Sequence, residues 1–353
     1  MNAHFSRALF IFAFLSIVAA SCLRQPGSYE TTAKLAYMPQ MRSVSFLGSN
    51  QASFVEEIGR DLRVSTDGGQ TWQVIPANSV VGGFESATIT PNGRAFAVNR
   101  EGRVFTANPP GSAWTEISDL KETEPRDFTG AEQIEFVDDK TGWILEFLSI
   151  WHTQDGGVTW SKKLSVLTPG VNGQPSGMYP LDSMTLVAIG GKGQVYLTRD
   201  GGANWKIQTV GTKPDLKDVW FSDNRTGWIC GYTSGRDSIS MVLFETKDGG
   251  ESWEELPIDE PNMMPSSVSF VENEGWISGR RYLKIGSAQP VLLHTQDGGA
   301  HWANMPVASD DPFFSLVRFI DKRNGWLVGR DNLYRSEDGG NTWRRVLALA
   351  PAG

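Results

Sequence analysis

Apolar and polar residues alternate in short runs along most of the chain, and turn-forming residues separate these runs. Between Lys217 and Phe221, for example, Val219 and Phe221 fall on one side of an extended chain, and a turn of the Asp-Asn-Arg type follows. Three further strand-like runs complete this unit: Gly227–Gly231, Met241–Thr246 and Ser252–Leu256. No stretch keeps the 3.6-residue period of an amphipathic helix. The pattern therefore predicts an all-β protein.

One eight-residue motif, Ser/Thr-x-Asp-Gly-Gly-x-x-Trp, recurs through the chain and divides it into units. Its six copies have their aspartates at Asp67, Asp155, Asp200, Asp248, Asp297 and Asp338. The spacings are 88, 45, 48, 49 and 41 residues, so the first gap holds a hidden copy. The segment from Thr106 to Trp114 fills that gap, with Asn108 in place of the aspartate and prolines in place of the glycines. We therefore expect seven units.

A second motif, which starts with Phe and ends in Gly-Trp six or seven residues later, precedes the first motif, here called the box, in four of the units. Its tryptophans are Trp143, Trp228, Trp276 and Trp326. Four short strands repeated every 40 to 50 residues are typical of a β-propeller. The sequence thus predicts a seven-bladed β-propeller over residues 41–353, in which the Gly-Trp tryptophans belong to the core.

The box itself fits a structural hairpin turn between the third and fourth strands of each unit. An aspartate can accept hydrogen bonds from turn amides, and the two glycines accept positive φ without a steric penalty. The tryptophan five places after the aspartate can wedge between neighbouring blades and bury about 200 Å². These tryptophans are Trp72, Trp114, Trp160, Trp205, Trp253, Trp302 and Trp343. One carboxylate per turn is a poor calcium loop, and we expect neither a metal nor a cofactor.

The first 40 residues read as a targeting segment and a tether. Arg7 precedes a 13-residue apolar run, which is too short to span a bilayer, and small residues then lead to Cys22. This arrangement resembles a bacterial lipoprotein signal. We therefore expect a signal peptide over residues 1–21, lipid on Cys22, a tether over 22–40, and an exported protein on the periplasmic, lumenal or outer surface of a bacterial membrane.

Composition narrows the possible functions. The chain has 353 residues and a formal net charge of −8, which disfavours nucleic-acid binding because phosphates attract basic surfaces. With Cys22 lipidated, Cys230 is left alone in an apolar run, where we expect a buried thiol with no catalytic role.

The box motif is similar to the Asp-box (BNR) repeat of sialidases, xyloglucanases and sortilin-type receptors. Together with the Gly-Trp element and the lipoprotein-like signal, the chain most resembles the photosystem II stability/assembly factor family over residues 40 to 348. That resemblance implies a non-catalytic propeller that acts as a scaffold for assembly of a membrane complex.

Two alternatives stay open. A secreted Asp-box glycoside hydrolase would need two facing carboxylates, and the 40 acidic residues do not exclude such a pair. A carbohydrate-binding propeller could use Trp151 or Trp220 as a platform. Of the histidines, His152 and His294 share one repeat position before the box, which favours a role in the strand over a metal site.

A candidate partner-binding surface follows from the loops between the second and third strands, which fall on the face opposite the box turns. Four acidic residues lie in these loops, at Asp61, Glu101, Asp237 and Asp331, against eight basic residues. The basic residues are Arg60, Arg100, Lys192, Arg236, Arg280, Arg281, Lys284 and Arg330. This excess favours an acidic segment of a membrane protein as the partner. Local pairing, as in Arg60–Asp61 or Arg330–Asp331, is the alternative.

Overall fold

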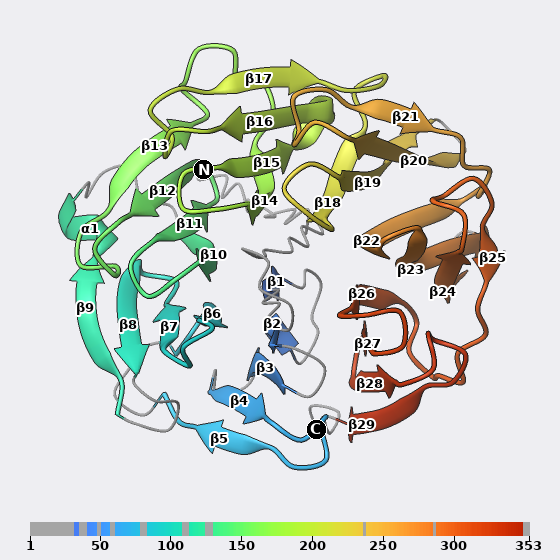
Figure 1. The fold of residues 1–353 in the computed structure, drawn as a ribbon, viewed down its shortest axis with the longest axis horizontal. Coiled ribbons are helices and arrows are strands. Elements are labelled where there is room, and N and C mark those ends of the chain that lie inside the picture. Colours follow the sequence, from blue (N-terminus) through green and yellow to red (C-terminus); the bar gives the residue numbers. More distant parts are fainter. Residues whose placement is uncertain are drawn as a thin grey trace, which may run out of the picture.

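The structure, a computed structural model, describes residues 32–34, 41–47, 51–56, 61–77, 83–107, 113–123, 130–235, 238–284 and 287–348. Seven antiparallel sheets are arranged around a central axis (Figure 1). This confirms the predicted seven-bladed β-propeller. The segment predicted to be a signal peptide, the predicted lipidation site Cys22 and the degenerate box at Asn108 lie outside the described residues.

Each blade takes four strands from one continuous part of the chain, and the first of them lies nearest the hub. Blade 1 contains β2 (Met41–Leu47), β3 (Gln51–Glu56), β4 (Leu62–Ser65) and β5 (Gln73–Ile75). Blade 2 contains β6 (Ser86–Ile89), β7 (Ala95–Val98), β8 (Arg103–Ala107) and β9 (Thr115–Asp119). Blade 3 contains β10 (Ala131–Phe136), β11 (Gly142–Glu146), β12 (Ser149–Thr153) and β13 (Ser161–Ser165).

The remaining blades repeat this order. Blade 4 contains β14 (Pro175–Pro180), β15 (Leu186–Gly190), β16 (Gln194–Thr198) and β17 (Lys206–Thr209). Blade 5 contains β18 (Asp215–Phe221), β19 (Gly227–Ser234), β20 (Ile239–Thr246) and β21 (Glu254–Leu256). Blade 6 contains β22 (Met263–Val271), β23 (Glu274–Lys284), β24 (Ser287–Thr295) and β25 (Ala303–Asn304). Blade 7 contains β26 (Phe314–Phe319), β27 (Gly325–Gly329), β28 (Asn332–Ser336) and β29 (Arg344–Ala348).

Helical structure is limited, among the described residues, to two short elements. They are α1 (Leu120–Thr123) and the 3₁₀ turn η1 (Gly191–Gly193). Among the described residues, therefore, no helical element has the length and hydropathy of a membrane-spanning segment.

The N-terminal strand β1 (Thr32–Lys34) pairs antiparallel with β2 at the hub (Figure 1). These residues fall within the tether that the sequence predicts over residues 22–40. The described residues of β1 instead add a fifth strand to blade 1, on the side of the central axis.

The sequence places the longest loops between second and third strands at Tyr232–Ser240 and Arg280–Gln289, but most of both segments is strand. In the first, β19 continues to Ser234 and β20 starts at Ile239; in the second, β23 continues to Lys284 and β24 starts at Ser287. The basic residues Arg280 and Arg281 therefore project from a strand, because the cross-strand ladder persists beyond the point where the apolar alternation ends.

The Gly-Trp element has a simple steric cause. Gly142 lies directly opposite Phe136 in the β10–β11 pair, and a Cβ on this glycine would come within 2.8 Å of the Phe136 ring. Gly227 has the same relation to Phe221. The glycine thus leaves room for a phenylalanine to lie flat on the neighbouring strand, and this explains why the two residues occur together in the motif.

Candidate partner-binding face

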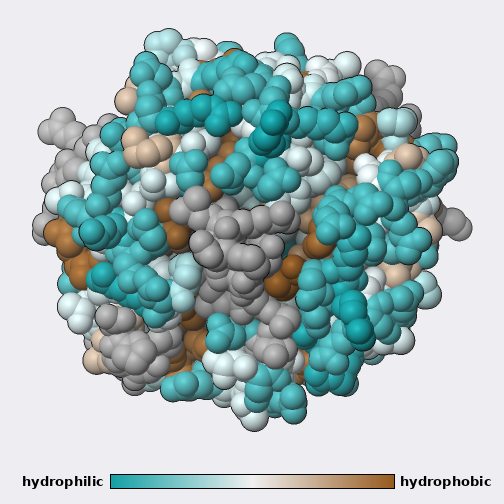
Figure 2. All heavy atoms as spheres, viewed as in Figure 1, coloured by the Kyte–Doolittle hydropathy of each residue, from teal (hydrophilic) through white to brown (hydrophobic). Residues whose placement is uncertain are grey.

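The antiparallel order of the strands sorts the connections of every blade onto two faces. The box turns and the turns between strands one and two lie at one end of the blades, which we call the box face. The loops between strands two and three, and the connections from one blade to the next, lie at the other end, which we call the loop face. The surface seen along the ring axis is largely hydrophilic (Figure 2).

The box aspartates are engaged in hydrogen bonds within their own turns. In the first box, Asp67 Oδ1 accepts from the Thr71 amide at 2.9 Å, and Asp67 Oδ2 accepts from the Thr71 hydroxyl at 2.6 Å. The Ser65 hydroxyl donates to Asp67 and accepts from the amide of Gly69, whose φ of 81° favours glycine. The Thr71 hydroxyl is the main cause that lowers the pKa of Asp67 to about 2. Each such carboxylate holds a turn in shape.

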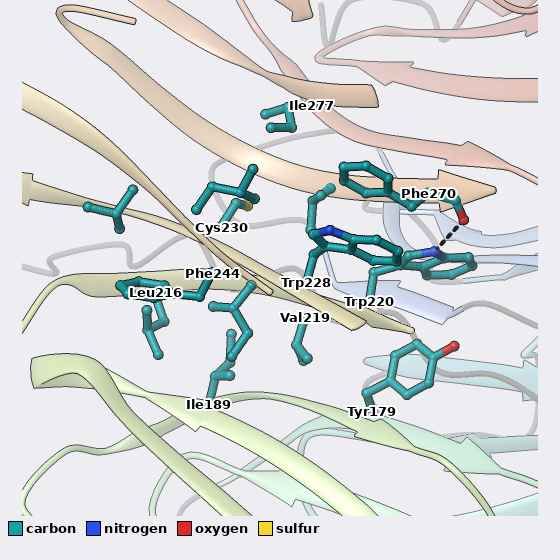
Figure 3. Packing of buried hydrophobic residues seen from close by; sticks show 14 of the residues in the cluster. Tyr179, Ile189, Leu216, Val219, Trp220, Trp228, Cys230, Phe244, Phe270 and Ile277 are labelled. Atoms are coloured by element: carbon teal, nitrogen blue, oxygen red, sulfur yellow. Dashed lines mark hydrogen bonds between the residues drawn. The ribbon is translucent and has the colours of Figure 1, made fainter. Parts of the chain in front are cut away.

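Three of the Gly-Trp tryptophans, Trp228, Trp276 and Trp326, stack on a phenylalanine of the next blade. Trp228 of blade 5 stacks on Phe270 of blade 6 at 3.9 Å between ring centroids (Figure 3), and Trp276 stacks on Phe319 of blade 7 at 3.6 Å. The box tryptophans pack against their own blade and also reach the neighbouring one, as expected of a wedge. Trp160 lies edge-on against Phe136 of its own blade, and Trp205 of blade 4 donates its indole N–H to the Lys163 carbonyl of blade 3 at 3.0 Å.

All four Gly-Trp tryptophans are buried, as predicted. Trp151 and Trp220 are buried as well, so the expectation that either could serve as an exposed sugar platform is wrong. Trp220 donates its indole N–H to the Phe270 carbonyl at 2.9 Å (Figure 3). His152 and His294 stack on Trp143 and Trp276, which accounts for their shared repeat position.

A buried ion pair at the hub joins three blades. Arg318 of β26 donates to Asp218 of β18 at 3.0 Å, and both side chains are completely buried. The same guanidinium donates to the Ser267 hydroxyl and the Val268 carbonyl of β22, in the blade between them. Burial raises the pKa of Asp218, and the charge of Arg318 opposes that rise. Sequence analysis missed this pair, although a charged residue on an otherwise apolar innermost strand is a signal for it.

Other buried carboxylates also have structural partners. Glu146 accepts from the Ser149 hydroxyl and from the Trp151 indole, and Asp311 accepts from the Tyr334 hydroxyl at 2.6 Å. Burial raises the pKa of the Cys230 thiol, which is free and buried as expected. Within the described residues, no group of three or more His, Cys, Asp or Glu side chains could hold a metal ion.

The loop face carries the predicted basic residues that the structure describes. Arg100, Lys192 and Arg330 are exposed in turns between second and third strands. Arg330 lies 3.7 Å from Asp331, and Arg281 pairs with Glu260 of the connection between blades 5 and 6. Arg60 and Arg236 lie outside the described residues, as does the side chain of Lys284.

The connections between blades also place charge on the loop face, and the sequence count did not include them. Lys121 and Lys213 add positive charge, whereas five acidic residues oppose it: Glu85, Asp259, Glu260, Asp310 and Asp311. The loop face is therefore mixed in charge, and a basic site on it has to be local.

One such local site lies on blades 5 and 6, and we call Lys217, Tyr232, Arg280 and Tyr282 the cation–aromatic patch. The Lys217 ammonium is 5.0 Å from the centre of the Tyr232 ring, and the Arg280 guanidinium is 5.2 Å from the centre of the Tyr282 ring. Lys217 is only 3% exposed, and burial is the largest cause that lowers its pKa. The nearby Asp215 carboxylate opposes this fall, and the charge of Arg280 adds a smaller lowering. Arg280 makes no ion pair with the carboxylates that the structure describes.

This geometry can be set beside known proteins. The family model described as "Photosynthesis system II assembly factor YCF48" matches residues 110–213 and 205–312, and the BNR/Asp-box repeat model matches residues 63–74. The chain belongs to the Ycf48 family. It is 31% identical over 314 residues to the photosystem II stability/assembly factor HCF136 of Cyanidioschyzon merolae, covering 81% of this chain and 69% of that protein.

A second relative in the Ycf48 family is the photosystem II assembly lipoprotein Ycf48 of Picosynechococcus. It is 30% identical over 199 residues, which cover 54% of this chain and 55% of that protein. Among solved structures, "YCF48 bound to D1 peptide" aligns with a TM-score of 0.64 at 18% identity, covering 91% of this chain and 97% of that one. YCF48 from Cyanidioschyzon merolae aligns with a TM-score of 0.57 at 20% identity, covering 75% and 86%. These structures show the shared fold.

Proposed function

We propose that this protein is a non-catalytic, lipid-anchored propeller outside the cytoplasm, which binds an acidic segment of a partner protein while a membrane complex assembles. Membership of the Ycf48 family supports the role in assembly. The name of one relative as a lipoprotein and the sequence before Cys22 support the anchor. The structural partners of Asp218, Glu146 and Asp311 support a scaffold over a hydrolase, which would keep two carboxylates free to react.

The cation–aromatic patch is the observation that carries the proposed binding mode. Two positive charges lie at this patch: Lys217, which is buried beside Asp215, and Arg280, which is partly exposed. An incoming carboxylate would form charge-assisted hydrogen bonds with the partly exposed Arg280 guanidinium. The rings of Tyr232 and Tyr282 offer apolar surface for the stem of the bound side chain or chain terminus. Arg100, Lys192 and Arg330 would extend the positive field around it.

The binding mode can be tested with a fluorescent peptide of alternating Asp and Ala residues that ends in a free carboxylate. We expect Arg280→Glu to weaken its binding by at least about tenfold in an anisotropy titration, and Arg280→Ala to weaken it less. Arg225→Ala is the matched control, because Arg225 is an exposed arginine on the box face of blade 5. Unchanged binding after replacement of Arg100, Arg280 and Arg330 together, with an unchanged melting temperature, would refute the proposed site.

The anchor is tested separately. Cys22→Ser should move the protein from the membrane fraction to the soluble fraction after export, because no lipid could be attached at residue 22. Affinity capture from the native membrane with the wild-type chain, and with Arg280→Glu as the comparison, then identifies the partner that depends on the patch.

A further inference from the structure

The register of β1 fixes which end of this strand lies nearer each face of the propeller. Thr32 is paired with Ser45, and Lys34 is paired with Ser43. The strand β2 runs from Met41 at the loop face to Leu47 at the box face, because Leu47 pairs with Gln51 next to the first box. Since β1 runs antiparallel to β2, Thr32 is its end nearer the box face. The chain therefore enters β1 at the end of this strand nearer the box face.

The sequence limits how far the lipid anchor can lie from Thr32. Nine residues, 23–31, separate Cys22 from Thr32, and we call them the N-terminal link. Ten Cα-to-Cα steps reach at most about 35 Å even when fully extended. The proposed lipid on Cys22 thus has to lie within about 35 Å of the box-face end of the hub.

This reach is too short for the loop face to contact the bilayer. A compact body of this size has a radius of gyration of about 20 Å, which corresponds to a sphere of roughly 25 Å radius. Strands of five to eight residues add a thickness of about 17 to 26 Å. A link that starts at the centre of the box face would need about 45 Å to pass around the rim to the loop face.

We propose that the protein sits on its membrane with the box face toward the bilayer and the loop face, with its cation–aromatic patch, turned away from it. This orientation rests on the lipid anchor of the proposed function. It specifies the kind of partner segment that the patch can take. Such a segment has to project from the membrane by at least the thickness of the propeller, or belong to a protein that approaches from the aqueous side.

The chemistry of the box face is consistent with an anchor that acts through the link alone. The pKa values of Asp67 and Asp200 are lowered to about 2, so both carboxylates on this face are ionised near neutral pH. Negative charge on the box face disfavours direct contact with anionic lipid. A test of orientation should accordingly use zwitterionic vesicles.

Two exposed apolar residues on opposite ends of blade 3 give a matched pair of labelling sites. Val158 lies in the box turn before β13, and Leu167 follows β13 on the loop face; they are 57% and 86% exposed. The full-length lipoprotein would carry Val158→Cys or Leu167→Cys, each labelled with one donor dye. Cys230 should not react because its thiol is buried. Energy transfer is then measured to acceptor lipids in phosphatidylcholine vesicles.

We expect more efficient transfer from the label at residue 158 than from the label at residue 167. Twenty Gly/Ser residues inserted after Gly27 should remove the difference, because the longer link lets the propeller turn over. Equal transfer from both sites with the native link, or more from residue 167, would overturn the orientation while leaving the anchor intact. Failure of the wild-type chain to float with vesicles would overturn the anchor, and the orientation with it.

The placement of β1 has its own test. Residues directly opposite in an antiparallel pair have Cα atoms about 4.5 to 5.5 Å apart, which a disulfide can bridge, whereas diagonal neighbours are about 7 to 8 Å apart. Thr32→Cys with Ser45→Cys should therefore cross-link under mild oxidation, and Thr32→Cys with Ser43→Cys should not. The reverse result would contradict the register of β1 and therefore the proposed orientation.

Discussion

Arg318 of blade 7 and Asp218 of blade 5 form an ion pair across the innermost strand of blade 6, with both side chains completely buried. Arg318 also lies 4.9 Å from the centre of the Trp220 ring, and Asp218 accepts the Val268 amide at 2.9 Å. The pair therefore couples three blades near the axis, where each blade is narrowest.

Breaking this pair on one side should be costly. Asp218→Ala leaves the Arg318 charge buried without its partner, so we expect a loss of about 3 to 5 kcal/mol in the free energy of unfolding. Urea titration followed by tryptophan fluorescence measures this loss. The double variant Asp218→Leu, Arg318→Met should recover much of the stability, because no charge is then buried. A double variant as unstable as the single one would contradict this account.

Ring closure should depend on Trp326. This residue of blade 7 stacks on Phe46 of blade 1 at 5.2 Å between centroids, and it is fully buried. Trp326→Ala should lower the free energy of unfolding by about 3 to 5 kcal/mol. Val74→Ala, at an exposed residue of β5 at the rim of blade 1, is the control and should change it by less than about 0.5 kcal/mol. If Trp326→Ala lowers the free energy of unfolding no more than the control does, the contact between blades 7 and 1 depends on other residues.

His152 should make stability fall on mild acidification. Burial is the largest cause that lowers the pKa of His152 from 6.5 to about 4. The unfolded chain then binds a proton at a higher pH than the folded chain does. Stability is complete above about pH 6.5 and declines by about 3 kcal/mol as the pH falls to 4. The free energy of unfolding, measured by urea titration between pH 4 and 6.5, should depend less on pH in His152→Gln. Equal pH dependence in the two proteins would contradict this role of His152.

The box aspartates should affect the stability of the protein at lower pH than His152 does. The Asn204 side chain is the main cause that lowers the pKa of Asp200 to about 2. The stabilising effect of this carboxylate is present above about pH 4 and is lost as the pH falls through 2. Asp200→Asn should therefore be less stable than the wild-type protein at pH 7, and the gap in urea midpoint should narrow between pH 4 and 2. A difference in urea midpoint that does not change with pH would show that the charge of Asp200 does not stabilise the protein.

The sequence predicted most of the fold because the information for each blade is local. The box and the Gly-Trp element specify two turns and two strands within about 40 residues, as the relation of Gly142 to Phe136 illustrates. Seven blades followed from their spacing. The end of β23 could not be predicted in this way, because backbone pairing continues beyond the residue at which the apolar alternation ends.

The candidate site was less predictable because it depends on residues far apart in sequence. The partners Asp218 and Arg318 are separated by 100 residues. Arg281 was expected on a free basic surface, but Glu260 of a preceding connection pairs with it. Arg280 was named from its position after the Gly-Trp element, whereas its proximity to Lys217 needed the three-dimensional arrangement.

Blades 1 and 7 each consist of consecutive strands and meet through side chains such as Phe46 and Trp326. A circularly permuted gene that began at another blade boundary would therefore encode the same seven sheets. Duplication of a single four-strand unit would build such a ring without any change in strand connectivity. Such a permutant would still form a ring, but its membrane attachment would start from a different place on the disc.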